Sequence, residues 1–144
     1  MNKNLIKAKG LLCANDYTCV IQNEDCVYTS RERGVKPLLA WMKEDVDFAG
    51  FSAADKVVGK AAAFLYVLLR VEAVYAKIIS APAVQILEKY DIQVFYDEKV
   101  EAIRNRTNTG FCPMETTVWE IENPKEALEA IRQKVSELSN PRIL

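Results

Sequence analysis

Histidine is absent from the 144 residues of the chain. This absence excludes serine–histidine and cysteine–histidine catalytic arrangements, histidine general bases and histidine metal ligands. No pair of acidic residues stands at a spacing typical of metal binding or of glycoside hydrolysis, so we expect neither a metal nor another cofactor. Any chemistry must then depend on Cys, Lys, Asp, Glu, Tyr or Arg side chains.

An excess of charge of either sign is also absent, since 19 Lys and Arg stand against 20 Asp and Glu and the net charge is -1. A sequence-independent nucleic-acid binder carries a basic excess, so we expect no nucleic-acid partner, although a local basic patch stays open. The longest apolar run, residues 61–69, is too short to span a bilayer. The N-terminal segment has lysines but no apolar core followed by a cleavage site. We therefore expect a cytoplasmic protein without membrane association.

Paired cysteines are a third missing feature. The cysteines are Cys13, Cys19, Cys26 and Cys112, with no C-x-x-C spacing among them, and without a signal peptide we expect no disulfide framework. Internal repeats and Pro- or Gly-rich linkers are missing too. Half of the residues are apolar and 27% are charged, which is typical of a globular protein, so we expect residues 1–144 to form a single domain.

Hydrophobic periodicity and turn residues predict the elements of the N-terminal half. Apolar residues at helical spacing predict a short amphipathic helix over residues 2–14. Two β-rich runs, residues 18–22 and 26–30, flank a polar turn and predict a hairpin. Pro37 is typical of the first turn of a helix, so the next helix is expected around it.

The segment Ser52–Leu69 is predicted as one long buried helix. Ser52, followed three residues later by Asp55, matches a capping box, so the helix is expected to begin at Ser52. Beyond that start the segment is apolar on nearly every face except at Gly59 and Lys60. Such a helix is covered by a sheet on one side and by other helices or a second subunit elsewhere.

The C-terminal half alternates strands and helices. We expect strand 72–80, helix 80–90, strand 92–97 and helices 113–119 and 123–138. A strand–helix–strand unit of this length implies a right-handed parallel crossover. Together, the elements predict an α/β fold, a three-layer α/β/α sandwich with a mixed sheet.

Cys112 is the candidate nucleophile, at the predicted start of a helix. If Cys112 is the N-cap, Pro113 is the first helical residue and Glu115 the third, which again is a capping-box spacing. The positive end of the helix dipole, together with Arg106, would favour the reactive thiolate form. In this interpretation Glu115 acts as acid/base. Alternatively, Cys112 is a small buried apolar residue and Glu115 only a cap.

Polar and basic residues elsewhere predict an anion site. The loop before Cys112 offers backbone N–H groups, hydroxyls and a cation, and its candidate binding residues are Asn105, Arg106, Thr107, Thr109 and Gly110. Lys56 and Lys60 stand four apart on the predicted helix and so share a face. Beside a buried surface they need carboxylates or a bound anion. Asp55 can supply one carboxylate, or it serves only as the cap.

A second basic cluster consists of Arg31, Arg33 and Lys36 around a glycine. By default we interpret it as a solvated loop. It gains a functional interpretation only if the fold brings it near Lys56 or Arg106.

Three stretches carry a family resemblance: RGVKPLL, ADKVVGKAAAFL and NRTNTGFCPME. Together they resemble the bacterial family of domain of unknown function 1893, over residues 10–135. The resemblance implies a cytidine-deaminase-like fold, which agrees with the predicted element order. Zinc deaminases carry H-x-E at the start of the central helix and P-C-x-x-C after the next strand. The corresponding segments here, SAADKVVGK and SAPAVQIL, hold no such ligand, so residue content excludes zinc deamination.

The resemblance also implies where a site would lie. The start of the central helix, with Asp55 and Lys56, would face the usual pocket of that scaffold, and loop 105–112 would close over it. We therefore expect a metal-free site for a small anionic metabolite such as a nucleotide, held by Lys56, Lys60 and Arg106. The alternatives are a non-catalytic binding or regulatory module, dimeric through its apolar helix or a sheet face, and a structural protein without a small-molecule site. Whether the protein is an enzyme stays open.

Overall fold

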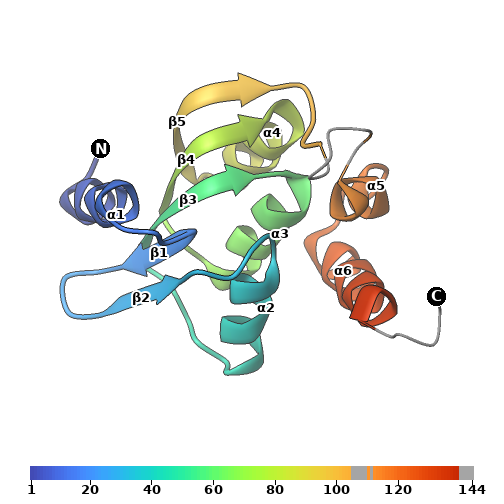
Figure 1. The fold of residues 1–144 in the computed structure, drawn as a ribbon, viewed down its shortest axis with the longest axis horizontal. Helices are drawn as coiled ribbons and strands as arrows, with labels where there is room; N and C mark the ends of the chain where they lie inside the picture. The colour runs from blue at the N-terminus through green and yellow to red at the C-terminus, as the bar shows by residue number, and fades with distance from the viewer. Residues whose placement is uncertain (105–109, 111, 140–144) are drawn as a thin grey trace.

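A five-stranded mixed sheet forms the centre of the protein in a computed structural model that describes residues 1–104, 110 and 112–139 (Figure 1). The strands are β1 (Cys19–Gln22), β2 (Val27–Ser30), β3 (Ser52–Val58), β4 (Ala73–Ser80) and β5 (Gln93–Val100). Their order across the sheet is β2-β1-β3-β4-β5. β1 runs antiparallel to β2 and β3, whereas β3, β4 and β5 are parallel. β2 and β3 therefore run in the same direction and end at the same edge of the sheet.

Helices flank this sheet and close two separate cores. The described helices are α1 (Lys3–Ala14), α2 (Lys36–Lys43), α3 (Lys60–Leu69), α4 (Ala81–Lys89), α5 (Pro113–Val118) and α6 (Pro124–Ser139). Ala54 and Tyr75 belong to the core under α1, whereas their neighbours Ala53 and Val74 belong to the larger core around α3. Successive strand residues point to opposite faces, so the two cores lie on the two faces of the sheet. The predicted mixed α/β class is confirmed.

Most predicted elements are present close to their expected bounds. The N-terminal helix, the hairpin of β1 and β2, the helix at Pro37 and the parallel unit β4-α4-β5 all form as expected. α6 begins behind Asn123, whose Oδ1 accepts hydrogen bonds from the backbone N–H groups of Lys125 at 2.9 Å and Glu126 at 3.2 Å. Within the described part of the chain, no helix is both long and apolar enough to cross a bilayer.

The predicted helix start at Ser52 is wrong, because residues 52–58 form the central strand β3. β3 lies between β1 and β4 and is buried along most of its length, so it reads as a continuous apolar run without strand alternation. The helix begins at Lys60, behind Gly59 as N-cap. The capping-box match was coincidental, since the Ser52 hydroxyl donates to Asn2 Oδ1 at 3.1 Å. Lys56 is consequently a strand residue and does not share a helix face with Lys60.

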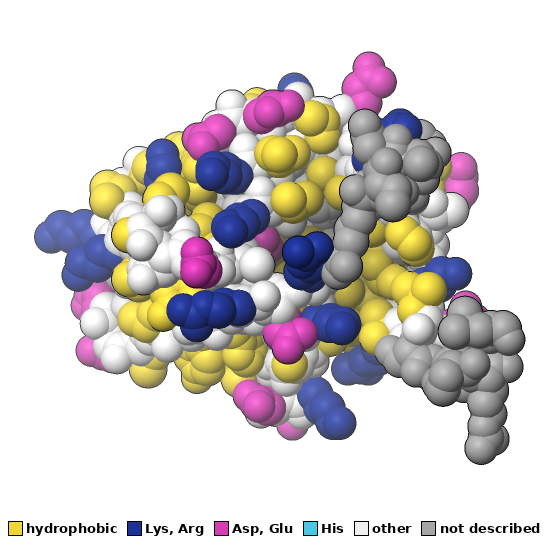
Figure 2. All heavy atoms as spheres, in the orientation of Figure 1, with side chains coloured by type: hydrophobic (Ala, Val, Ile, Leu, Met, Phe, Trp, Pro, Cys, Tyr) yellow, Lys and Arg dark blue, Asp and Glu magenta, His cyan; other side chains and the backbone are white. Residues whose placement is uncertain are grey.

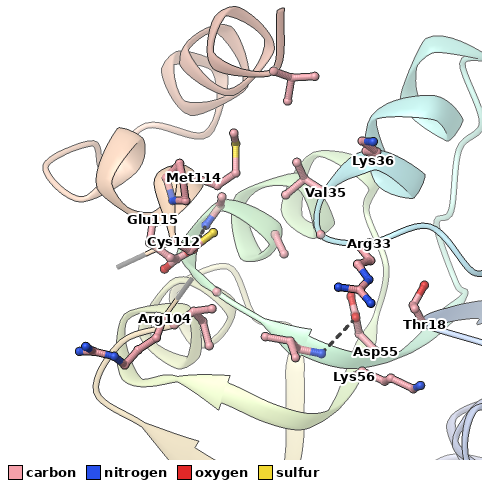
Figure 3. A pocket seen from close by; sticks show the side chains of 18 of the residues that line it. Thr18, Arg33, Val35, Lys36, Asp55, Lys56, Arg104, Cys112, Met114 and Glu115 are labelled. Carbon is pink, nitrogen blue, oxygen red and sulfur yellow. Dashed lines mark hydrogen bonds between the residues drawn. The ribbon is translucent and has the colours of Figure 1, made fainter. Parts of the chain in front are cut away.

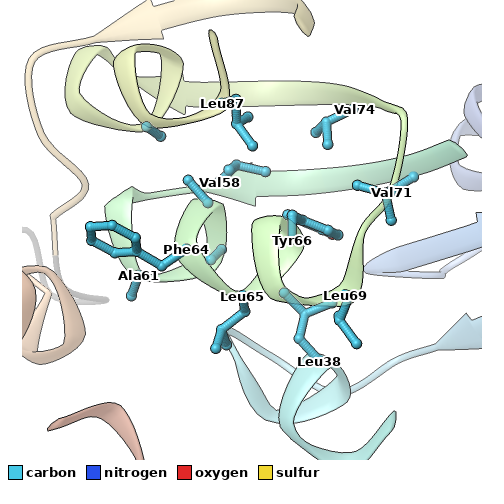
Figure 4. Packing of buried hydrophobic residues seen from close by; sticks show 14 of the residues in the cluster. Leu38, Val58, Ala61, Phe64, Leu65, Tyr66, Leu69, Val71, Val74 and Leu87 are labelled. Carbon is cyan, nitrogen blue, oxygen red and sulfur yellow. The ribbon is translucent and has the colours of Figure 1, made fainter. Parts of the chain in front are cut away.

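α3 is the most deeply buried helix, as its all-round apolar sequence predicts. Phe64, Leu65 and Tyr66 are fully buried in it. Figure 4 shows α3 packed against Leu38 of α2 and Leu87 of α4, with β3 and β4 behind it. Each such side chain contributes about 1.5–3 kcal/mol by leaving water. The apolar sequence of α3 is thus explained by its position between the sheet and the neighbouring helices.

Candidate functional site

A pocket of about 1030 Å³ lies at the carboxyl ends of β2 and β3. The segment that follows β2 contributes Arg31 and Arg33, and the end of β3 contributes Asp55 and Lys56. α5 closes the opposite side with Cys112 and its first turn, as Figure 3 shows. Open α/β sheets place ligand sites at the carboxyl ends of strands, beside the position where the strand order reverses. Here the order reverses between β1 and β3.

Basic side chains outnumber acidic ones among the described residues that line the pocket. The basic ones are Arg31, Arg33, Lys36, Lys56 and Arg104, and the acidic ones are Asp16, Asp55 and Glu115. Arg31 stacks over the ring of Tyr17 at 4.6 Å. Arg33, Lys36 and Lys56 form no ion pair with any residue that the structure describes. Several Lys and Arg side chains also gather near the middle of the face drawn in Figure 2. The fold therefore brings the basic cluster that follows β2 into one pocket with Lys56, which is the condition under which it gains a functional interpretation.

Asp55 is a buried acid at the wall of this pocket, with 7% of its surface exposed. Its Oδ2 accepts a hydrogen bond of 2.6 Å from the hydroxyl of Tyr66, and its Oδ1 accepts one of 3.3 Å from the backbone N–H of Val57. Burial raises the pKa of Asp55 from 3.8 to about 7, against the opposing effect of these hydrogen bonds. The carboxyl can therefore gain or lose a proton near neutral pH.

Tyr66 and Cys19 extend the hydrogen-bonded chain from Asp55 into the core. The Tyr66 hydroxyl lies 3.2 Å from the Cys19 sulfur, and because the hydroxyl proton goes to Asp55, the thiol is the donor to Tyr66. Burial raises the pKa of Tyr66 and of Cys19 well above their ordinary values, so both stay protonated at neutral pH. No sequence pattern indicates this chain of three groups, because it arises from the pairing of Cys19 with Asp55 across β1 and β3.

Glu115 binds a different helix from the one that contains it. Its Oε2 accepts from the backbone N–H of Lys60 at 2.9 Å and its Oε1 from that of Ala61 at 3.3 Å. The predicted capping role within its own helix is thus corrected, because Glu115 supplies the acceptor at the start of α3. It is 2% exposed, and burial raises its pKa against the effect of the two N–H groups.

Gly59 is required by the position of Glu115. A Cβ added at residue 59 would lie 2.1 Å from Glu115 Oε1 and 2.4 Å from its Cδ. No side chain fits there without moving the carboxylate. This explains the glycine directly before the buried helix.

Lys60 does not line the pocket in which we expected it. Its Nζ donates to the backbone oxygen of Trp119 at 2.9 Å and lies 3.3 Å from Glu122 Oε1. These contacts join the start of α3 to the turn between α5 and α6. The position of Lys60 thus matches the structural ion pairing that the sequence left open.

Cys112 lies at the pocket as the N-cap of α5, and its side chain makes no capping hydrogen bond. Its role as a nucleophile stays a prediction. Among the loop candidates, Gly110 is described and partly exposed. Asn105, Arg106, Thr107 and Thr109 lie outside the described residues. Over the described ranges, no group of three Cys, Asp or Glu side chains is arranged to hold a metal ion.

Comparison with known proteins assigns a family to this fold. Residues 7–135 match the family described as TM1506, domain of unknown function (DUF1893). A crystal structure of a DUF1893 family protein (TM1506) from Thermotoga maritima superposes with a TM-score of 0.83 at 29% sequence identity, over 95% of this chain and 92% of that one. Curated proteins give no match. The chain belongs to the DUF1893 family, a domain of unknown function.

Proposed function

We propose that the pocket at the ends of β2 and β3 binds a small anionic metabolite. The observation that carries the proposal is the set of three cations, Arg33, Lys36 and Lys56, that line one pocket without an ion-pair partner among the described residues. Positively charged side chains gathered at a concave site raise the local concentration of anions. A phosphate or carboxylate would supply the missing counter-charge.

The remaining walls of the pocket indicate what is attached to the anionic group. Val35, Met114, Val135 and Leu138 contribute apolar surface, and the volume of about 1030 Å³ suits a molecule larger than a free inorganic ion. A ring or another apolar body carrying a phosphate or carboxylate, as in a nucleotide, matches both parts of the pocket. The mixed sheet and the site at its carboxyl edge also support a cytidine-deaminase-like scaffold.

Binding, and not catalysis, is the function that the geometry supports best. Glu115, the expected acid/base, already accepts two backbone N–H groups of α3, so it is committed to holding that helix. Cys112 faces the pocket as a single thiol. The proposal therefore holds whether or not Cys112 reacts.

A thermal-shift screen tests the proposal with pairs of compounds that differ in one charged group. Nucleotides are compared with their nucleosides, and sugar phosphates with their sugars. We expect at least one anion to raise Tm, and its neutral parent to raise it less. If no anion in a broad library raises Tm more than its neutral parent does, the proposal is contradicted and a structural protein is favoured.

A matched pair of lysine variants tests whether the anion binds in this pocket. Lys56→Gln removes a pocket cation and should weaken the anion about tenfold, as expected for one charge-assisted hydrogen bond. Lys77→Gln is the control, because Lys77 is an exposed residue of the neighbouring strand β4 and does not line the pocket. Equal losses in both variants would mean that the anion binds elsewhere.

A further inference from the structure

Asp55 is an acid within a basic pocket, and the anion site as proposed gives it no role. It lines the same pocket as Lys56 and Arg33, yet no described cation lies within ion-pair distance of it. Instead, its carboxylate oxygens accept from Tyr66 and from the backbone of Val57. A carboxyl group that is ionised at this position would repel an entering anion.

The groups around Asp55 leave it as the group that changes charge near neutral pH. Tyr66 of α3 and Cys19 of β1 contact it or its partner, and burial keeps both protonated. Lys56, its neighbour on β3, and Arg33, from the segment after β2, are cations. Burial raises the pKa of Asp55 to about 7. Glu115, on the far side of the pocket, is the other buried carboxyl there, and two backbone N–H groups hold it. Asp16, which precedes β1, is an exposed acid that also lines the pocket.

We propose that Asp55 takes up a proton when an anion enters the pocket and then donates a hydrogen bond to it, with Tyr66 as the residue that positions the carboxyl. The step balances simply, because one proton moves from solvent to the carboxylate and no covalent bond of the ligand changes. A protonated carboxyl has one O–H donor, and the Tyr66 hydroxyl and Val57 N–H hold the group in the pocket wall. The inference rests on the proposed anion site and adds its specificity, which favours oxyanions over cations and amines.

The probe for this proposal is naphthalene-2-sulfonate, because its charge stays constant near neutral pH and its ring resembles the expected apolar body. Binding is measured by calorimetry from about pH 6 to about pH 9, in pairs of buffers with different ionisation enthalpies. We expect the affinity to fall by up to about tenfold per pH unit above pH 7. We also expect uptake of about one proton per bound ligand in that range.

Three variants identify the residue that takes up the proton when the ligand binds. Asp55→Asn should bind with little pH dependence and without proton uptake, whereas Glu115→Gln should retain both. Tyr66→Phe removes a hydrogen bond that favours the ionised carboxyl, so the pH at which the affinity begins to fall should move upward. A purely structural role of Tyr66 would leave that pH unchanged. If Asp55→Asn does not fold, the shift in Tyr66→Phe decides the question.

The outcomes separate this inference from the function on which it rests. If the sulfonate fails to bind at every pH, or if Lys56→Gln binds it as well as the wild type does, the anion site itself is contradicted. If it binds at the pocket with constant affinity and no proton uptake, the role of Asp55 is overturned and the anion site stands. Uptake that persists in Asp55→Asn and vanishes in Glu115→Gln would assign the proton to Glu115 and likewise overturn the proposal.

Discussion

The titration of a single side chain, Asp55, makes the stability of the protein depend on pH. Burial raises the pKa of this acid from 3.8 to about 7, so between these values the folded protein holds a proton that the unfolded chain has lost. Stability from this group is complete below about pH 4 and is lost as the pH rises through about 7. Above that range an ionised carboxylate has to be kept buried.

The prediction at this residue is a change in the pH profile of unfolding. The free energy of unfolding of the wild type should fall between about pH 4 and pH 8 relative to that of Asp55→Asn, by up to about 4 kcal/mol. Urea unfolding at several pH values measures the difference. Asp25→Asn is the control, since Asp25 is exposed in the hairpin turn. Parallel profiles of wild type and Asp55→Asn would contradict the prediction.

Gly59 provides a second prediction at the residue scale. Gly59→Ala should destabilise the protein by about 1–3 kcal/mol, because the added methyl group displaces the Glu115 carboxylate. Its backbone φ of -98° is accessible to alanine, so the cost comes from contact alone. Gly10→Ala is the matched control, since a Cβ at Gly10 in α1 meets no atom within 4 Å and should stabilise the helix by about 0.5–1 kcal/mol. The additional loss from Gly59→Ala should be smaller in a Glu115→Ala background.

Contacts between residues close in the sequence could be predicted, whereas contacts between distant residues could not. The cap at Asn123 was predictable, because its partners are two and three residues away. The partners of Glu115 are 54 and 55 residues away, so its spacing within α5 suggested a local cap that does not form. The contact between Asp55 and Tyr66 was hidden for a related reason, since it requires residue 55 to be in a strand.

At the scale of elements, β3 is the informative difference between sequence and structure. β2, at one rim of the sheet, alternates in exposure and was predicted as a strand. β3 is paired on both sides and largely covered on both faces, so its alternation is lost and it continues the apolar pattern of α3. Only Gly59 separates the two elements. The candidate site changed with this boundary, because Lys56 is a strand residue that lines the pocket, whereas Lys60 contacts Trp119 and Glu122 between α5 and α6.

The contrast between the two lysines is a prediction at this scale. Lys60→Met should increase amide hydrogen exchange in α5 and in the following turn, because it removes the contacts with Trp119 and Glu122. Its affinity for an anionic ligand should change little. Lys56→Gln should show the opposite pattern, with unchanged exchange in α5 and weakened binding. Loss of binding without increased exchange in Lys60→Met would mean that Lys60 contacts the ligand after all.

At the scale of the whole molecule, the four thiols report on the pocket and on the core. Cys13 and Cys26 are exposed, Cys19 is buried and Cys112 is partly exposed at the pocket. Iodoacetamide labelling followed by mass spectrometry should modify Cys13 and Cys26 in the native protein and Cys19 only after unfolding. A bound anion should protect Cys112 while leaving the two exposed cysteines unchanged. Equal protection of all three would indicate a global effect and not occupancy of the pocket.

The position of Glu115 also bears on the order in which the protein forms. The first two amides of the central helix find their acceptor in a residue that is synthesised more than fifty positions later. A nascent chain that stops short of Glu115 contains all five strands and α3, but the start of its most buried helix has no carboxylate to bind. The sheet can assemble early, whereas the junction between β3 and α3 is completed only when α5 reaches it. The centre of this molecule is thus among the last parts of it to be finished.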